Sequence, residues 1–210
     1  VYKRQLENNE DTGTLQYLAS TAMEAGFSTR VLDMQALDLQ NGRFFDPAGE
    51  LVNRCFKLYP WEWMVDESPD GCLAEMEWLE PIWKLVMSNK AILATLYELF
   101  PDSPYVLPCY LSRPRSGLFC KKPVFSREGH NVSVVDIRNW EEHVRIAETE
   151  GDYNTGAYVY QEYVEPTVYS GRYPVIGSWI IGGEAVGIGI RENRMEVTDN
   201  LSEFVPHIIG

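Results

Sequence analysis

The chain has 210 residues, 45% of them hydrophobic and 12% aromatic, and a formal net charge of −13 at pH 7. This composition supports a sizeable core in one domain or one and a half, whereas the negative charge argues against general binding to nucleic acids or anionic membranes, which requires a basic face. No apolar run approaches the roughly 18 residues of a membrane span, so we expect neither a nucleic-acid nor a membrane partner.

The cysteines are scattered, without CxxC spacing and without a neighbouring pair of histidines. They are Cys55, Cys72, Cys109 and Cys120. This pattern is typical of reduced, partly buried thiols rather than of metal ligands or a disulfide framework. We therefore expect a reducing, cytoplasmic environment.

The first five residues, Val1 to Gln5, resemble the translated end of a transposon adapter used in sequencing libraries, and we expect them to be non-biological. Without Lys3 and Arg4 the basic count falls from 18 to 16 against 31 acidic residues, which gives a net charge of −15. On this interpretation the reading frame is cut, and the chain is the C-terminal piece of a longer protein.

Apolar residues recur at helical spacing over residues 15–23. This predicts a helix that Thr12 or Thr14 caps and that Gly26 ends. Arg30–Met34 then predicts a strand. A helix followed by a strand is half of an α/β unit, and the strand expected before the helix is absent, as truncation would leave it.

In the segment Asp38–Phe45, Asn41-Gly42 lies between short apolar flanks, which predicts a hairpin, and Asp46–Gly49 predicts a turn. The following segment, Cys55–Trp63, is rich in aromatic residues. Aromatic residues so arranged pack in a core or between domains more often than they form a cage around a ligand, and Pro60 is placed to start a short helix.

The apolar stripe of residues 92–100 predicts a helix that Ser88 caps and that ends before Pro101. Lys90 then falls in the first turn, where the helix dipole disfavours a cation. A nearby anion would compensate, and a phosphate held jointly by Lys90 and Lys122 is one candidate. A solvated lysine that tolerates the cost is the alternative.

A basic region in this acidic chain extends from Leu111 to Asn131 and contains one acid, Glu128. Its basic residues are Arg113, Arg115, Lys121, Lys122 and Arg127. An apolar run with a lysine pair, a Ser-Arg-Glu-Gly turn and a second alternating run predict two strands joined by a loop. Gly129 lets backbone N–H groups approach an anion, so the loop can close over a phosphate. An exposed hairpin with a solvated tip is an equal alternative.

The C-terminal third begins with a charged segment, residues 139–152, that predicts an exposed helix and loop. Ala157–Val164 predicts a strand, and Tyr173–Ile181 with Ala185–Arg191 predicts a hairpin around a Gly-Gly turn. Alternating glycines in the second strand leave one face open to a ligand. Arg191 at its end suits a transferring phosphoryl group, although salt bridges at the rim would look the same.

The order of these motifs resembles the C-terminal part of the glutathionylspermidine synthase family of ATP-grasp ligases, especially stand-alone members without an amidase domain. The resemblance extends from Glu10 to Ile209, and its motifs are Phe56–Trp63, Ser88–Ala91, Lys122-Pro123, Ser126–Gly129, Tyr160–Glu162 and Gly187–Arg194. It implies an α/β (α+β) protein. Residues 87–210 would form a partial ATP-grasp fold with mixed or antiparallel sheets, and residues 6–86 a truncated, pre-ATP-grasp-like α/β segment.

The resemblance also implies a reaction, in which ATP phosphorylates a carboxylate and an amine attacks, releasing ADP and phosphate while Mg²⁺ neutralises the phosphates. The implied substrates are a small carboxylate such as a thiol peptide and a polyamine-like amine. Residues implied to bind ATP are Lys90, Lys122, Ser126, Gly129 and Asn131 for the phosphates, and Gln161, Glu162, Tyr163 and Val164 for the adenine. The implied catalytic residues are Arg127, in the loop that closes over the phosphates, and Arg191.

This sequence departs from the family's pattern in two ways, which limits how far the family's residue roles apply to it. Asn200 stands where the characterised synthetase has a lysine, and a strand glutamine of that enzyme falls near Val175. The family places its magnesium ligands, including a Glu-x-Asn element, upstream of this chain. Glu7 and Asn9 have that spacing, but a solvated helix lead-in is the preferred interpretation, so no metal ligand is predicted here and the fragment alone is expected to be inactive. An ATP-binding module without ligase activity and a structural interaction domain are the alternatives.

Overall fold

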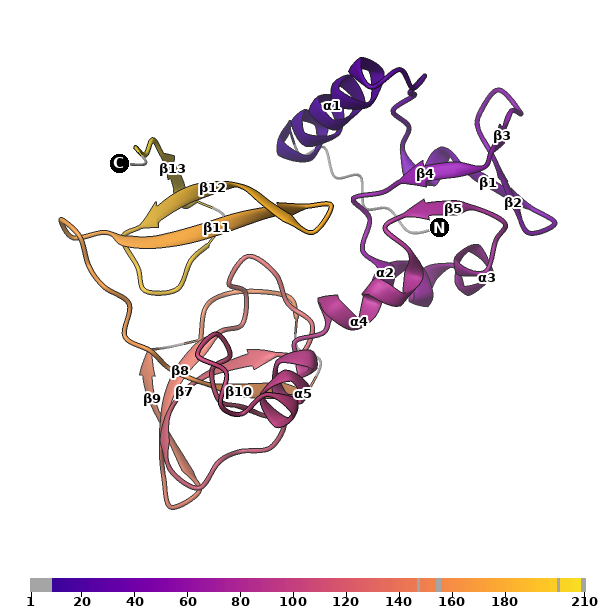
Figure 1. Cartoon of the computed structure of the whole chain (residues 1–210). Coiled ribbons are helices and arrows are strands. Elements are labelled where there is room, and N and C mark those ends of the chain that lie inside the picture. The colour runs from indigo at the N-terminus through magenta and orange to yellow at the C-terminus, as the bar shows by residue number, and fades with distance from the viewer. Residues whose placement is uncertain (1–8, 147, 154–155, 200, 209–210) are drawn as a thin grey trace. The chain divides into compact units, whose positions relative to one another are not determined.

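The computed structural model describes residues 9–146, 148–153, 156–199 and 201–208 (Figure 1). The chain divides into two compact units, a first unit of residues 1–86 and a second unit of residues 87–210. The fold is a mixture of helices with antiparallel and parallel strand pairs. Within the described residues, no helix is both long and apolar enough to cross a membrane.

The first unit combines one long helix with short helices and two small sheets. Strands β1, β2 and β3 form an antiparallel sheet, and β4 and β5 form a parallel pair. Its elements are α1 (Asn9–Glu24), η1 (Met34–Ala36), β1 (Asp38–Gln40), β2 (Arg43–Phe45), β3 (Leu51–Val52), β4 (Arg54–Phe56), α2 (Trp61–Glu67), α3 (Pro69–Cys72), β5 (Glu77–Leu79) and η2 (Ile82–Lys84), and α4 (Leu85–Ser88) crosses into the second unit.

Helix α1 confirms the prediction from apolar spacing. It begins at Asn9, so Thr12 and Thr14 lie inside the helix and the prediction that either residue caps it was wrong. Its end is as predicted, because Gly26 has a φ of +90°. The amides of Gly26 and Phe27 donate to carbonyls of the preceding turn at 2.9 and 3.0 Å, the paired bonds of a glycine-terminated helix.

The strand predicted at residues 30–34 is not formed, so that prediction was wrong. The Asp33 carboxylate accepts a hydrogen bond from the Gln35 amide at 3.0 Å and thereby caps η1. A local side-chain bond of this kind offers the backbone an alternative to a sheet ladder. The β-branched and apolar composition of the segment therefore did not decide its conformation.

The predicted hairpin is formed by β1 and β2, with Asn41 and Gly42 at φ +49° and +74°. Both turn residues are left-handed, as a two-residue hairpin turn requires. The predicted turn at residues 46–49 is also present, and the Asp46 carboxylate stabilises it by accepting the amides of Ala48 and Glu50, each at 2.9 Å.

The core of the first unit is largely aromatic, and the prediction for Cys55–Trp63 is confirmed for Trp61 and for Tyr59, which packs against this core, but not for the exposed Phe56. Trp78 packs edge-on against Trp61 and Phe44, with ring centroids 5.3 and 5.8 Å apart. Helix α2 begins directly after Pro60, as predicted. The buried members of this core are Phe44, Trp61, Met64, Cys72 and Trp78.

The second unit contains a five-stranded antiparallel sheet in the order β6-β10-β7-β8-β9 and a three-stranded antiparallel sheet in the order β11-β12-β13. Helix α5 contacts β6 and β10 of the larger sheet. The elements are α5 (Ala91–Leu99), β6 (Cys109–Tyr110), β7 (Gly117–Pro123), β8 (Ser133–Arg138), β9 (Glu141–Ile146), β10 (Tyr158–Glu162), β11 (Tyr173–Ile181), β12 (Glu184–Asn193) and β13 (Glu203–Val205).

Several predictions in the second unit are confirmed. Strands β7 and β8 flank a loop in the basic region, β10 lies within the predicted strand, and β11 and β12 form the predicted hairpin. Helix α5 ends before Pro101 as predicted, but its N-terminal amide, that of Ala91, is accepted by Asn89 at 2.9 Å. Ser88 is the last residue of α4, so its predicted capping role was wrong. All four cysteines are free thiols, as predicted.

The helix predicted within residues 139–152 was wrong. Residues 141–146 form β9, which pairs with β8 through a tight turn where Asn139 and Trp140 have φ values of +50° and +71°. Strand β9 is an edge strand, and charged residues are well suited to such an edge because they discourage pairing with another chain. The charge run was therefore a poor indicator of helix.

Candidate anion-binding pocket

The second unit contains an open pocket of about 320 Å³ above one face of the five-stranded sheet. Strands β7 and β8 provide its floor, the start of α5 and the loop at residues 126–129 provide one side, and residues 196–198 provide another. The residues that line it are Lys90, Cys120, Lys122, Ser126, Arg127, Glu128, Gly129, Val132, Val134, Tyr163, Glu196, Val197 and Thr198. Three basic residues, Lys90, Lys122 and Arg127, therefore line one cavity.

Strand geometry determines which lysine of the pair reaches the pocket. Neighbouring residues of a strand point to opposite faces of its sheet. Lys122 shares the pocket face with Cys120, whereas Lys121 points to the other face, where it contacts Glu142. The Lys122 ammonium donates to the side-chain carbonyl of Gln161 at 2.7 Å, so the neighbouring strand β10 orients it.

Lys90 reaches the pocket from the start of α5, where it occupies the N-cap position. Its backbone amide donates to the Val124 carbonyl at 2.7 Å, which ties the helix start to the end of β7. Its ammonium donates to the Ser126 carbonyl and, at 2.9 Å, to the Ser126 hydroxyl. Lys90 and the loop are therefore held together.

The loop at residues 126–131 contains a tight left-handed turn. Glu128 and Gly129 have φ values of +53° and +73°, and the His130 amide donates to the Arg127 carbonyl at 2.8 Å. A side chain at Gly129 would have no room, because its Cβ would lie 2.2 Å from the Thr198 carbonyl oxygen. Glycine is thus required here both for its φ value and for close packing.

The end of β10 forms the remaining wall of the pocket. The amides of Glu162 and Tyr163 donate to the carbonyls of Pro108 and Leu118 at 2.7 and 2.9 Å, which fixes the course of the backbone. The Tyr163 hydroxyl donates to the Glu196 carboxylate. Burial, followed by the contact with Glu196, raises the pKa of Tyr163, which stays a neutral donor.

The structure gathers some of the predicted site residues and separates others. Those that line the pocket are Lys90, Lys122, Ser126, Arg127, Gly129 and Tyr163, with Gln161 one hydrogen bond away. Asn131 is buried outside it, where its side chain accepts the Tyr153 amide at 2.8 Å and donates to Glu148 at 3.3 Å. Glu162 and Val164 are exposed and do not line the pocket.

Arg191 lies on β12 rather than in the pocket lining. It stands opposite Val175 of β11 and Phe204 of β13, and its guanidinium carbon is 5.9 Å from the Phe204 ring centroid. Of the glycines on the face predicted to be open, Gly187 has open space around it, since a Cβ there would meet no atom within 4 Å, whereas a Cβ at Gly189 would lie 3.8 Å from the Phe204 ring. Asn200 and Glu7, which the sequence analysis singled out, lie outside the described residues.

The sequence interpretation missed part of the lining. Strand alternation could have identified Cys120 and Val134. Cys120 is two residues from Lys122 and so lies on the same face of β7, and Val134 of β8 pairs with Cys120. The segment Glu196–Thr198 carries no local signal that would have placed it here. Only the packing of the chain brings it against the loop.

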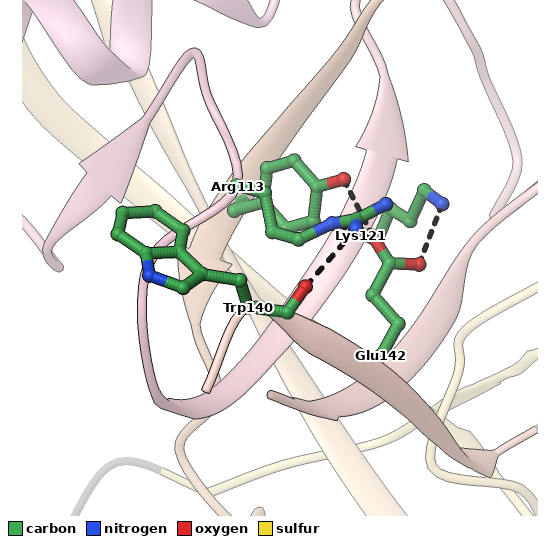
Figure 2. A network of polar contacts seen from close by, with 5 residues as sticks. Arg113, Lys121, Trp140 and Glu142 are labelled. Atoms are coloured by element: carbon green, nitrogen blue, oxygen red, sulfur yellow. Dashed lines mark hydrogen bonds and ion pairs between the residues drawn. The ribbon is translucent and has the colours of Figure 1, made fainter. Parts of the chain in front are cut away.

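Two basic residues of the Leu111–Asn131 region, Arg113 and Lys121, are partnered on the opposite face of the sheet (Figure 2). The Glu142 carboxylate accepts hydrogen bonds from Arg113 at 2.8 Å, from Lys121 at 2.9 Å and from the Tyr160 hydroxyl at 2.7 Å. Arg113 also donates to the Trp140 carbonyl at 3.1 Å. Burial alone would raise the pKa of Glu142, but the hydrogen bonds and charges of these partners outweigh it and lower that pKa.

The donor set of the pocket fits a phosphate chain better than a metal ion. It provides ammonium groups from two separate elements and a left-handed turn, and such turns present backbone N–H groups to anions. Across the described residues there is no group of three or more histidine, cysteine, aspartate or glutamate side chains that could hold a metal. The pocket lining contains two carboxylates, the exposed Glu128 and the half-buried Glu196.

A family model described as glutathionylspermidine synthase pre-ATP-grasp matches residues 2–210. A Haemophilus influenzae protein provisionally named acid–amine ligase is 36% identical over 207 residues, which cover 94% of this chain and 53% of that protein. Trypanothione synthetase of Crithidia fasciculata is 36% identical over 130 residues, 60% of this chain and 19% of that protein.

The bifunctional glutathionylspermidine synthetase/amidase of Escherichia coli is 26% identical over 241 residues, covering 100% of this chain and 38% of that protein. The chain thus spans about half the length of the Haemophilus relative and a smaller share of the other two. The family model covers every residue that lines the pocket.

Proposed function

Because the chain belongs to the glutathionylspermidine synthase family, we propose that its second unit binds ATP for a carboxylate–amine ligase of the ATP-grasp type. The observation that carries this proposal is the convergence of Lys90 and Lys122 on one pocket beside a left-handed, glycine-containing loop. Two lysines on separate rigid elements can grip neighbouring phosphates, and the loop adds backbone donors.

In this proposal Lys122 binds a phosphate oxygen while Gln161 keeps its side chain extended across the sheet. Lys90 now donates to Ser126, and a phosphate oxygen would accept the same ammonium alongside that hydroxyl. Arg127, which also lines the pocket, would bind the terminal phosphate. Charge-assisted bonds of this kind are shorter and stronger than neutral ones.

We assign the adenine to the end of β10 and the residues that follow it, 161–164, of which Tyr163 lines the pocket. The sheet already uses the amides of Glu162 and Tyr163, so the base would meet the groups that follow, including the backbone of Val164. The Tyr163–Glu196 hydrogen bond would hold this wall in place.

The proposed reaction joins a small carboxylic acid, such as a thiol peptide, to a polyamine-like amine. A carboxylate oxygen attacks the terminal phosphorus of ATP and releases ADP; the amine then attacks the acyl carbon and displaces phosphate. We propose that Arg191 stabilises the negative charge that develops in these steps. Magnesium would neutralise the phosphates, and we expect its carboxylate ligands to come from the half of the longer relatives that this chain does not span.

The test has two parts. ATP binding to this chain is measured by calorimetry, and ADP release is measured with a thiol peptide and a polyamine, together and singly. We expect the 210-residue chain to bind ATP without turnover, and a version that spans the whole length of the Haemophilus relative to release ADP only when both substrates are present.

Binding by both versions without substrate-dependent ADP release would instead indicate a nucleotide-binding module. Failure of both versions to bind ATP would indicate a structural interaction domain. Turnover by this chain alone would contradict our assignment of the metal ligands to the other half.

A further inference from the structure

A short segment, residues 148–153, supports the loop at residues 126–131 from the side away from the pocket. None of its residues lines the pocket. It closes tightly on the loop, because a Cβ at Gly151 would lie 2.4 Å from the His130 Cβ and 2.6 Å from the Asn131 side-chain oxygen. We call it the support segment.

Thr149 makes the central contacts of the support segment. Its backbone amide donates to the Val132 carbonyl at 2.9 Å, and its carbonyl accepts the Asn131 amide at 3.2 Å. Its hydroxyl accepts the Val132 amide at 2.9 Å and donates to the Gly129 carbonyl. A single hydroxyl therefore spans the loop from Gly129 to Val132, with its donor and acceptor capacity both in use.

The turn that Thr149 contacts is costly without external support. Glu128 has a left-handed φ of +53°, a conformation that is sterically unfavourable for a residue with a side chain. The Gly129–His130 peptide is fixed at both ends, because its carbonyl is bound by Thr149 and its N–H donates to Arg127. The Gly129 carbonyl oxygen, which would repel a phosphate, is thereby held toward a residue outside the pocket.

We propose that Thr149 is a positioning residue for nucleotide binding, whose hydroxyl holds the left-handed turn at Glu128–Gly129 in the shape that accepts phosphate. It acts through the backbone of Gly129 and does not contact the ligand. This inference rests on the proposed function, since it assigns to Thr149 the preorganisation of the same phosphate-binding loop.

The decisive variants are Thr149→Val, which keeps the shape and removes the hydroxyl, and Thr149→Ser, which keeps the hydroxyl. Ile137→Val is the matched control, because it trims the core on the other sheet face and so lowers stability without contacting the loop. Each variant is made in the full 210-residue chain. ATP affinity is measured by calorimetry and loop opening by amide hydrogen exchange over residues 126–132.

We expect Thr149→Val to weaken ATP binding roughly three- to tenfold, the effect of one lost hydrogen bond, and to speed exchange in the loop. Thr149→Ser should restore both values to those of the unmodified chain, and Ile137→Val should change neither. Unchanged affinity and unchanged exchange in Thr149→Val would overturn the inference, as would equal weakening of ATP binding by Ile137→Val.

The hydrogen-exchange measurement separates this inference from the proposed function. If the unmodified chain binds no ATP, the proposed function fails, and the role of Thr149 in nucleotide binding fails with it, whatever the exchange shows. If the unmodified chain binds ATP and Thr149→Val opens the loop without loss of affinity, the positioning role alone is wrong.

Discussion

Two neighbouring lysines of β7 lie on opposite faces of the five-stranded sheet and have different partners there. On one face the Lys121 ammonium lies 2.9 Å from the Glu142 carboxylate, which Arg113 and Tyr160 also contact. On the other face Lys122 donates to the neutral amide of Gln161, and no carboxylate of the described chain lies within ion-pair distance of it. The two residues are adjacent in sequence, yet one is matched by protein charge and the other faces a pocket.

The difference in partners indicates that an anion can bind Lys122 more readily than Lys121. A cation that already shares a carboxylate gives up part of that interaction when it binds a ligand, whereas a cation held by a neutral amide does not. The pocket face also places Lys122 beside Gly129 and Lys90, while the other face is filled by Phe119, Val135 and other core residues. The comparison predicts that variants on one face change stability and variants on the other change ligand affinity.

The largest expected effect is on stability, from Glu142→Ala. The side chains of Glu142 and Lys121 are only 16% and 21% exposed, so removing the carboxylate leaves partly buried donors without their acceptor. We expect the free energy of unfolding to fall by about 2–4 kcal/mol in chemical denaturation. Glu141→Ala, on an exposed neighbour in β9, is the control and should change little. Equal stability of the two variants would show that the network does not stabilise the sheet.

The next effect is on ligand binding, from Lys122→Met. Loss of one charge-assisted hydrogen bond to phosphate should weaken ATP binding by roughly 1.5–3 kcal/mol, measured by calorimetry, with little change in unfolding. Lys121→Met is the matched variant, and it should reduce stability while leaving the ATP affinity of the folded protein unchanged. If the two variants weakened ATP binding equally, the distinction between the faces would be lost. Unchanged affinity in both Lys122→Met and Lys90→Met would remove the phosphate assignment.

The features that could be predicted from sequence are those determined by local chemistry. Asn41-Gly42 and Gly26 required left-handed backbone, and the structure has both. The loop in the basic region was predictable because β7 and β8 are neighbours in the chain and pair directly. Local rules failed where a longer-range partner decided the outcome, as in β9, whose pairing with β8 overrides a charge run that favoured a helix.

The site was predictable to the same extent. Lys122 and Gly129 both line the pocket, and the sequence interpretation could name both because the motif that holds them is continuous in sequence. Lys121 and Arg113 belong to the same basic region of the sequence, and no local pattern shows that Glu142 on another strand partners both. The wall at residues 196–198 depends on packing between segments about seventy positions apart, which no local pattern reports.

A smaller effect is expected from Gly129→Ala, which tests the pocket face through its backbone. The added Cβ would lie 2.2 Å from the Thr198 carbonyl oxygen and would also have to adopt a φ of +73°. We expect a loss of about 1–2 kcal/mol in stability, with weaker ATP binding, measured by denaturation and calorimetry. Gly156→Ala is the control: its φ is also +73°, but its Cβ would meet no atom within 4 Å, so it carries the conformational cost alone. Equal effects would show that close packing at Thr198 is unimportant.

The smallest expected effect is a pH dependence that belongs to the Glu142 face. The network lowers the pKa of Glu142 from its ordinary value of 4.5, so the folded protein binds a proton there less readily than the unfolded chain does. The resulting stability is complete above about pH 4.5 and is lost as the pH falls through the lower, folded pKa. Because the network is partly open to solvent, we expect this acid-dependent part to amount to a few tenths of a kcal/mol.

Glu142→Gln should remove this acid-dependent stability and flatten the acid side of the stability profile. The profile is measured by urea unfolding between pH 3 and pH 6, roughly the range over which carboxylates titrate. Glu141→Gln should leave the profile unchanged, and a profile that is equally steep in both variants would show that Glu142 is not the group that titrates.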